Sequence, residues 1–270
     1  MVKRKMDKFD SDFAKKYFFH YCLITSPDFY KPDREYLKNL CEEMQDFVND
    51  NNYDILIINE PPRHGKSRTS GKFIEWILGN DQSKKVMTGS YNETLSTTFS
   101  KGVRNTIQEI KADKNRVVFS DVFPNVEIKQ GDGAMNLWSL EEGYNNYLAT
   151  SPTGTATGFG ADIILIDDLI KNAEEANNAT VLEKHWDWFV NTMLSRLEAG
   201  GKIIIIMTRW HTNDLAGRAL RELPLSGYKV KHISMKAYNE VTGNMLCDEI
   251  LSKEDYSKKI KTMGRDIAMV

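Results

Sequence analysis

The sequence predicts an α/β fold, a three-layer sandwich in which helices cover both faces of a mainly parallel central sheet. Four aliphatic runs are short, rich in β-branched residues and followed by polar or turn-forming residues, as buried parallel strands are. Helical stretches separate these runs, and such alternation is typical of three-layer α/β domains. The expected strands are residues 55–58, 86–87, 163–166 and 203–207, and the expected helices are residues 66–78, 92–110 and 173–197.

Smaller regions are expected on both sides of this core. Residues 35–48 place apolar side chains at helical spacing before the first strand. Residues 131–162 are rich in Gly, Ser and Thr and indicate two extended segments and a loop. A helix at 214–222 and a strand at 229–234 precede a polar tail. The expected regions are residues 1–52 (N-terminal helical segment), 53–212 (core) and 213–270 (small C-terminal lid or linker subdomain).

The composition argues against several classes of protein. The net charge of −2 and the pI near 6.2 over 270 residues do not suit a protein that coats nucleic acid, although a local basic face stays open. The cysteines, Cys22, Cys41 and Cys247, are widely spaced and odd in number, which favours a reducing cytoplasm over a disulfide framework. Aspartates interrupt the N-terminal apolar positions, and the aliphatic runs fall well short of the ~18 residues of a membrane span. We expect a cytoplasmic protein without a membrane partner.

A phosphate-binding loop is the first motif. Residues 59–70 read NEPPRHGKSRTS and follow a predicted strand, and Gly65, Lys66 and Ser67 fill the last places of the Walker A pattern G-x-x-x-x-G-K-[ST]. Glu60 replaces the first glycine, and two prolines stiffen the entry. Arg63 adds a cation able to reach a γ-phosphate. The predicted nucleotide-binding residues are Pro62, Arg63, His64, Gly65, Lys66, Ser67 and Arg68.

The second motif is a pair of acidic residues, as in a Walker B motif. IILIDDLIK places Asp167 and Asp168 at the end of an apolar strand. One carboxylate there can hold Mg²⁺ and its neighbour can polarise an attacking water. A Gly-Lys-Ser triplet alone occurs by chance in turns, but together with these acids it predicts a P-loop hydrolase of nucleoside triphosphates that uses Mg²⁺.

A third motif follows the last predicted strand. Thr208 and Arg209 begin the segment TRWHTND, and parallel strands deliver their C-terminal ends to the ligand crevice. They are therefore expected beside the γ-phosphate, where they can sense hydrolysis and pass the change onward. The alternative is a strand-to-helix turn in which residues 211–214 cap the next helix, and both can hold at once.

The segments PPRHGKS, IDDLIKNAEEA and TRWHTNDLAGR, in this order, resemble the ATPase half of the large terminases of tailed phages. The resemblance runs from about Tyr36 to the tail ILSKEDYSKKIKTMG. It implies an ATP-driven motor that moves double-stranded DNA into a procapsid in the host cell cytoplasm. It also implies a ring of subunits on a portal protein and a small terminase subunit as a partner.

The resemblance also implies residue roles. Lys66 is expected to bind the β- and γ-phosphates, Ser67 and Asp167 to hold Mg²⁺, Arg63 to contact the γ-phosphate, and Thr208 to begin the coupling element. Many such motors carry glutamate as the catalytic base after the strand-end aspartate. This chain has Asp168 there, which we expect to act as the base, with Glu174 or Glu175 as alternatives.

Further expectations concern the neighbouring subunit and the two ends of the chain. Arg104 is the candidate arginine supplied in trans, against the alternative of a surface arginine. Adenine is expected beside the N-terminal segment, on Tyr30 or Tyr36, unless these are core residues. Large terminases carry a nuclease after the ATPase, and the acids left near this C-terminus, Glu254, Asp255 and Asp266, are too few for one. We expect no nuclease domain or DNA cleavage from this chain.

Two rival functions remain. One is another DNA-stimulated P-loop ATPase, such as a helicase-like translocase. The other is a ring subunit that binds ATP without hydrolysing it.

Overall fold

The computed structural model describes residues 8–154, 156 and 158–263, so Asp266 lies outside the described residues. Within them, eight strands form one sheet in the order β3-β4-β5-β2-β6-β7-β1-β8. In the run β5-β2-β6-β7-β1-β8, all neighbouring strands are parallel. At the other edge of the sheet, β4 pairs antiparallel with both β5 and β3. The strands are β1 (Ile55–Asn59), β2 (Val86–Gly89), β3 (Ile128–Gly133), β4 (Leu137–Leu140), β5 (Tyr147–Thr150), β6 (Ala161–Asp167), β7 (Leu197–Met207) and β8 (Val230–Ser234).

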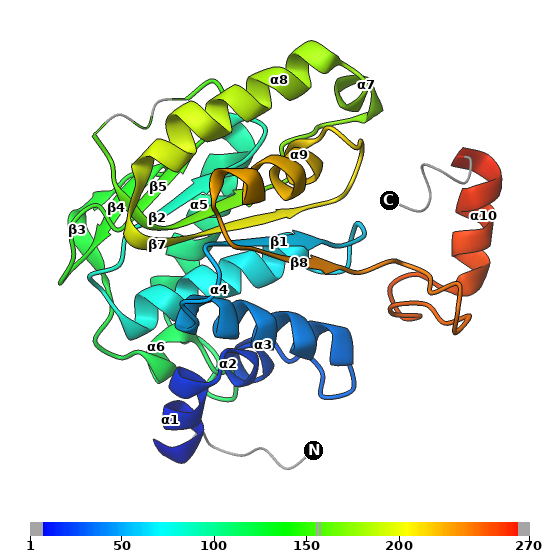
Figure 1. Cartoon of the computed structure of the whole chain (residues 1–270). Helices are drawn as coiled ribbons and strands as arrows, with labels where there is room; N and C mark the ends of the chain where they lie inside the picture. The colour runs from blue at the N-terminus through cyan, green and yellow to red at the C-terminus, as the bar shows by residue number, and fades with distance from the viewer. Residues whose placement is uncertain (1–7, 155, 157, 264–270) are drawn as a thin grey trace.

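Helices cover both faces of the sheet, which confirms the α/β sandwich (Figure 1). One layer contains α3 and α4 together with the N-terminal helices, and the other contains α8 and α9. The helices are α1 (Lys8–Lys16), α2 (Phe18–Thr25), α3 (Glu35–Asn49), α4 (Lys66–Asn80), α5 (Glu93–Ile107), α6 (Phe119–Val122), α7 (Ala173–Ala176), α8 (Ala179–Trp188), α9 (Leu215–Glu222) and α10 (Lys253–Met263).

Strand alternation explains why the central strands are apolar throughout. Leu56 and Ile58 of β1 belong to the core beneath the N-terminal helices, whereas Ile55 and Ile57 belong to the core beneath α8 and α9. All four side chains are fully buried. A strand covered on both faces has no position for a polar side chain until it ends.

The sheet register brings the three motifs together. Asn59 at the end of β1 pairs with Met207 at the end of β7, and Asp167 at the end of β6 pairs with Ile206. Because these strands run parallel, the segments that follow them emerge at one edge of the sheet. The phosphate loop, the acid pair and the TRWHTND segment therefore meet there.

The prediction of one helix over residues 173–197 is wrong in detail. It consists of α7, α8, a π turn (Phe189–Met193), a 3-10 turn (Leu194–Arg196) and the start of β7. Asn172 accepts a hydrogen bond from the Glu175 N–H, and Asn178 accepts from those of Thr180 and Val181. Each asparagine caps a separate helix N-terminus, which divides the segment.

The sheet continues beyond residue 212, where the core region was expected to end. β8 pairs in parallel with β1, and α9 packs in the core beneath α8, so the sheet domain extends to Ser234. After β8, Ala237, Met245 and Tyr256 form a small separate cluster. Glu249 ties this part to the body by ion pairs of 2.7 Å to Lys31 and 2.5 Å to Arg34.

The segment 131–162 contains β4 and β5 in full, which match the two extended segments expected there. It also contains the end of β3 and the start of β6. Over the described part of the chain, the helices are too short or too polar to cross a membrane.

Candidate nucleotide-binding site

The phosphate loop runs from the end of β1 into the first turn of α4 and has two residues in the left-handed backbone region. Arg63 has φ 67° and Gly65 has φ 113°. A Cβ atom at Gly65 would lie 2.7 Å from the ring of Phe29. Glycine is therefore required there for both backbone conformation and space. The loop ends at Lys66, so the N–H groups of the first turn of α4 face the end of the sheet.

A cavity of about 500 Å³ lies against this loop. Eight residues predicted from the sequence line it, namely Pro62, Arg63, Gly65, Lys66, Ser67, Arg68, Asp168 and Thr208. Phe29, Ile170, Lys171 and Trp210 complete the lining. The cavity thus joins residues from all three motifs, although Lys66 and Thr208 are 142 positions apart in the sequence.

Lys66 connects the three motifs directly. Its Nζ donates a hydrogen bond of 2.7 Å to Thr208 Oγ1 and lies 3.7 Å from Asp168 Oδ2. The other oxygen of Asp168 accepts a hydrogen bond of 2.8 Å from the Thr208 N–H. A phosphate that recruits Lys66 must therefore compete with Thr208 and Asp168 for the same ammonium group.

Asp167 is buried at the floor of the site, and Asp168 is half-buried beside it. Burial raises the pKa of Asp167, and the neighbouring Asp168 raises it further, while a hydrogen bond from the Ser67 hydroxyl and the charge of Lys66 oppose the shift. Burial also raises the pKa of Asp168, against the effects of Lys66 and the Thr208 N–H. Asp167 Oδ1 is buried and has no partner among the described residues.

The residues present fit a magnesium ion. Asp167 offers a buried carboxylate oxygen without a donor, and the Ser67 hydroxyl lies within hydrogen-bonding reach of the same carboxylate. Carboxylate and hydroxyl oxygens are the ligands that Mg²⁺ takes beside nucleotide phosphates. A bound cation would also remove the cost of ionising Asp167 in its buried position.

Glu60 is a third carboxyl group at this site, and no role was predicted for it. Its side chain is 2% exposed, and neither of its oxygens has a partner among the described residues. Burial raises its pKa to about 8; Lys66 opposes this shift, while Asp167 and Asp168 add to it. In the sequence, Glu60 stood out only because it replaces the first glycine of the Walker A pattern. Its burial could not be predicted, because it depends on residues distant in the sequence.

Replacing Glu60 with glutamine is expected to flatten the pH dependence of stability. Between its ordinary pKa of 4.5 and its folded pKa of about 8, Glu60 keeps a proton that the unfolded chain releases. The free energy of unfolding therefore falls as pH rises through this window, by up to about 1.4 kcal/mol per pH unit. An amide has no such proton.

Urea unfolding at a series of pH values in this window measures the slope for the wild-type chain and for Glu60→Gln. Glu141→Gln, at an exposed carboxylate, is the matched control and should keep the wild-type slope. Equal slopes in the wild type and Glu60→Gln would contradict the raised pKa.

The segment after β7 is organised by Asp214, whose side chain is fully buried. Its Oδ2 accepts hydrogen bonds from the Trp210 and His211 N–H groups and from Arg209 Nε, and its Oδ1 accepts from the Gly217 N–H. Asp214 thus caps α9, as the strand-to-helix alternative expected. Thr208 lines the cavity, whereas the Arg209 guanidinium is held by Asp214 and the His211 carbonyl outside the lining.

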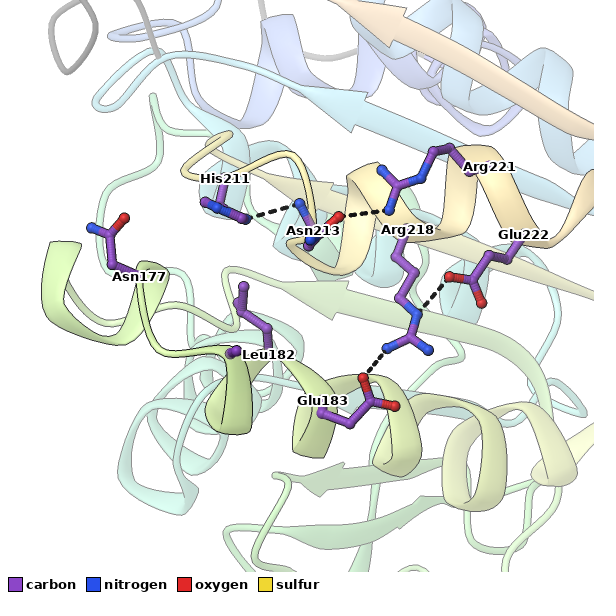
Figure 2. Close-up of a pocket in the computed structure, with 9 residues that line it drawn as sticks. Asn177, Leu182, Glu183, His211, Asn213, Arg218, Arg221 and Glu222 are labelled. Carbon is purple, nitrogen blue, oxygen red and sulfur yellow. Dashed lines mark hydrogen bonds and ion pairs between the residues drawn. The ribbon is translucent and has the colours of Figure 1, made fainter.

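A second cavity, of about 330 Å³, lies between α8 and α9 behind this segment (Figure 2). Arg218 bridges Glu183 of α8 and Glu222 of α9 at 2.5 and 2.6 Å. Arg221 donates to Asn213, whose N–H donates to His211 Nδ1. Glu183, Arg218, Arg221 and Glu222 of the lining therefore all have partners; Arg218 links α9 to α8, and Arg221 links Asn213 to α9.

Several predicted residues lie away from the main cavity. His64 is 1% exposed, and its Nδ1 donates to the Pro62 carbonyl. Tyr30 and Tyr36 are core residues bonded to the Thr69 hydroxyl and the His64 carbonyl, so neither is placed to stack on adenine. The aromatic residues of the lining are Phe29 and Trp210, and nothing in the sequence pattern singled them out.

The remaining candidates are Arg104, Glu174 and Glu175. The Arg104 guanidinium donates to the carbonyls of Gly133 and Ala134 in the β3–β4 turn, outside the cavity lining. Glu175 Oε2 accepts the Lys171 N–H at 3.0 Å. Glu174 is exposed and is not part of the lining.

Solved structures and a family model match this chain, whereas no curated protein does. The large terminase of bacteriophage HK97 superposes with a TM-score of 0.55 at 14% identity, over 87% of this chain and 47% of that one. The large terminase of a thermophilic bacteriophage, solved in complex with ATP-gamma-S, gives a TM-score of 0.45 at 14% identity, over 79% and 45%. The chain thus spans about half the length of these terminases.

The family model describes the N-terminal part of the terminase large subunit of T4-like-virus type, and it matches residues 57–260. The match covers well over half of the chain and includes the phosphate loop, the acid pair and the segment after β7. The HK97 likeness supports the P-loop α/β fold independently. The chain belongs to the terminase large subunit family.

Proposed function

We propose that this chain is the ATP-hydrolysing motor domain of a large terminase, which drives double-stranded DNA into a procapsid. One observation carries the proposal: Lys66 of the phosphate loop contacts both Thr208 and Asp168, so three motifs distant in sequence form a single site. Membership of the terminase large subunit family supports DNA as the proposed substrate of such a motor.

The chemistry follows from the side chains present. Lys66 and the N–H groups at the start of α4 bind the phosphates, and Ser67 and Asp167 would hold Mg²⁺. When bound there, Mg²⁺ would neutralise part of the phosphate charge. Asp168 orients the attacking water and accepts its proton. The water oxygen forms a bond to the γ-phosphorus, the bond from that phosphorus to the β,γ-bridging oxygen breaks, and ADP and phosphate leave.

Coupling to movement is proposed to begin at Thr208. Its hydroxyl accepts the Lys66 hydrogen bond and its N–H donates to Asp168, so a change in either partner reaches the end of β7. From there, Asp214 fixes the following segment to α9, and Arg218 fixes α9 to α8. Rearrangement at the γ-phosphate would thus move a helix pair, which is the kind of two-state element that coupling requires.

The proposed partners are those of a packaging motor: DNA, a portal protein, a small terminase subunit and further copies of this chain in a ring. The proposed trans arginine remains Arg104. Its carbonyl contacts hold it at the β3–β4 turn, so it would have to exchange them for a phosphate in the neighbouring subunit.

ATP hydrolysis by the purified chain, with and without linear double-stranded DNA, tests the proposal. We expect slow turnover without DNA and faster turnover with it, and no separation of strands in a parallel assay of a labelled duplex. Strand separation would favour the helicase-like alternative. ATP binding without turnover under any of these conditions would favour a catalytically silent ring subunit.

A further inference from the structure

The cavity against the phosphate loop holds one basic residue that no motif assigned. Four cations line it, namely Arg63, Lys66, Arg68 and Lys171, against the single carboxylate of Asp168. Such an excess of positive charge suits a ligand with several negative charges. Lys171 comes from the segment between β6 and α7, on the acid-pair side, whereas the other three belong to the phosphate loop and α4.

These cations differ in whether they already have partners. Lys66 contacts Thr208 and Asp168. Arg68 pairs with Asp28 at 2.9 Å and lies over the Phe29 ring. The side chains of Arg63 and Lys171 are exposed and make no hydrogen bond or ion pair with the rest of the described chain. They are therefore the two cations available to a new ligand without loss of an existing contact.

The backbone that carries Lys171 is fixed although its side chain is free. Leu169 and Ile170, just before it, are 0% and 5% exposed and belong to the core beneath α8. The Lys171 N–H donates to Glu175 Oε2, and the Glu175 N–H donates to Asn172 Oδ1, each at 3.0 Å. These contacts set the Cα position of Lys171 three residues after Asp168 and leave only the flexible side chain to adjust.

We propose that Lys171 is a further catalytic residue, which contacts the γ-phosphate in cis from the side opposite the phosphate loop. This inference rests on the proposed function of the site. As water attacks and the bond to the β,γ-bridging oxygen breaks, negative charge grows on that oxygen and its neighbours. The Lys171 ammonium stabilises this charge without transferring a proton. An isolated subunit thereby gains basal hydrolysis before any arginine arrives from a neighbour.

The first test is a set of variants assayed for ATP turnover at protein concentrations where the rate is proportional to concentration. Lys171→Ala and Lys171→Met are expected to lower kcat by about a hundredfold with KM changed little, because the contact strengthens in the transition state. Lys171→Arg should retain most of the activity. Lys184→Ala, at an exposed lysine of α8 outside the cavity lining, is the matched control and should match the wild type.

Binding of ADP with aluminium fluoride, a mimic of the transferred phosphoryl group, separates a catalytic role from a structural one. Lys171→Ala should weaken binding of this complex and leave binding of ADP alone unchanged. Equal weakening of both, or a wild-type kcat in Lys171→Ala, would overturn the proposal. If the wild-type chain itself shows no turnover, the proposed function fails, and this inference fails with it.

Mixed subunits decide between action in cis and in trans. A Lys171→Ala chain mixed with a Lys66→Ala chain should turn over ATP no faster than the Lys171→Ala chain alone, because neither subunit has both lysines in one cavity. Recovery of activity in that mixture would place Lys171 in the neighbouring site and overturn the proposal. A mixture of Arg104→Ala and Lys66→Ala chains provides the contrast. If Arg104 acts in trans, ATP turnover should recover in that mixture.

Discussion

Replacing Lys66 with alanine is expected to abolish ATP hydrolysis and to weaken ATP binding. Lys66 is 6% exposed at the floor of the cavity, and its Nζ is the group that contacts both other motifs. Neither Arg63 nor Lys171 comes from the first turn of α4, so neither can take its place between the phosphates and Thr208. Loss of this cation should lower kcat by about a thousandfold or more.

Turnover and the affinity for a fluorescent ATP analogue should be measured on the same preparations. Because the substitution also leaves Thr208 Oγ1 and Asp168 without their lysine partner, urea unfolding must show that the variant is folded. Lys101→Ala, at an exposed lysine of α5, controls for loss of a positive charge elsewhere. Wild-type turnover by a folded Lys66→Ala chain would remove the phosphate loop from the reaction.

Replacing Asp168 with asparagine is expected to stop turnover and to spare ATP binding. Asparagine tolerates the left-handed backbone that Asp168 adopts, with φ 41°, and its amide oxygen can still accept the Thr208 N–H. It cannot accept a proton from water, and general-base catalysis contributes typically about 10²–10⁴-fold in rate. We therefore expect a large loss in kcat with little change in nucleotide affinity.

The same assay tests the alternative catalytic bases. Full turnover by Asp168→Asn would indicate that Glu174 or Glu175 is the base. Glu174→Gln and Glu175→Gln, each combined with Asp168→Asn, would show which of the two it is. Glu175 already accepts the Lys171 N–H, so it would have to give up that hydrogen bond, whereas Glu174 is exposed. Neither lines the cavity as Asp168 does.

The sequence was sufficient to predict those parts of the candidate site that lie at the ends of parallel strands. The ends of β1, β6 and β7 carry the phosphate loop, the acid pair and Thr208, and a parallel sheet must bring such ends to one edge. Apolar runs marked these strands reliably because they are buried on both faces. β8 is an edge strand with mixed exposure, so its place beside β1 was not evident from the sequence.

Features that depend on contacts between distant segments could not be predicted. The partners of Arg104 come from the β3–β4 turn, 29 and 30 positions away, and Tyr30 is bonded to a threonine 39 positions away. The burial of Glu60 likewise depends on the packing around the phosphate loop. In the sequence, nothing distinguishes Lys171 from other loop lysines; only the structure shows that it lines the cavity.

The most direct test of the central claim is a structure of this chain with Mg²⁺, ADP and aluminium fluoride. The account predicts the nucleotide in the cavity of about 500 Å³, with Lys66 Nζ on the phosphoryl mimic in place of Thr208 Oγ1 and Asp168 facing the water to be activated. It also predicts Mg²⁺ on Ser67 and Asp167. A nucleotide bound elsewhere, such as in the cavity between α8 and α9, or a Lys66 that still donates to Thr208, would contradict it.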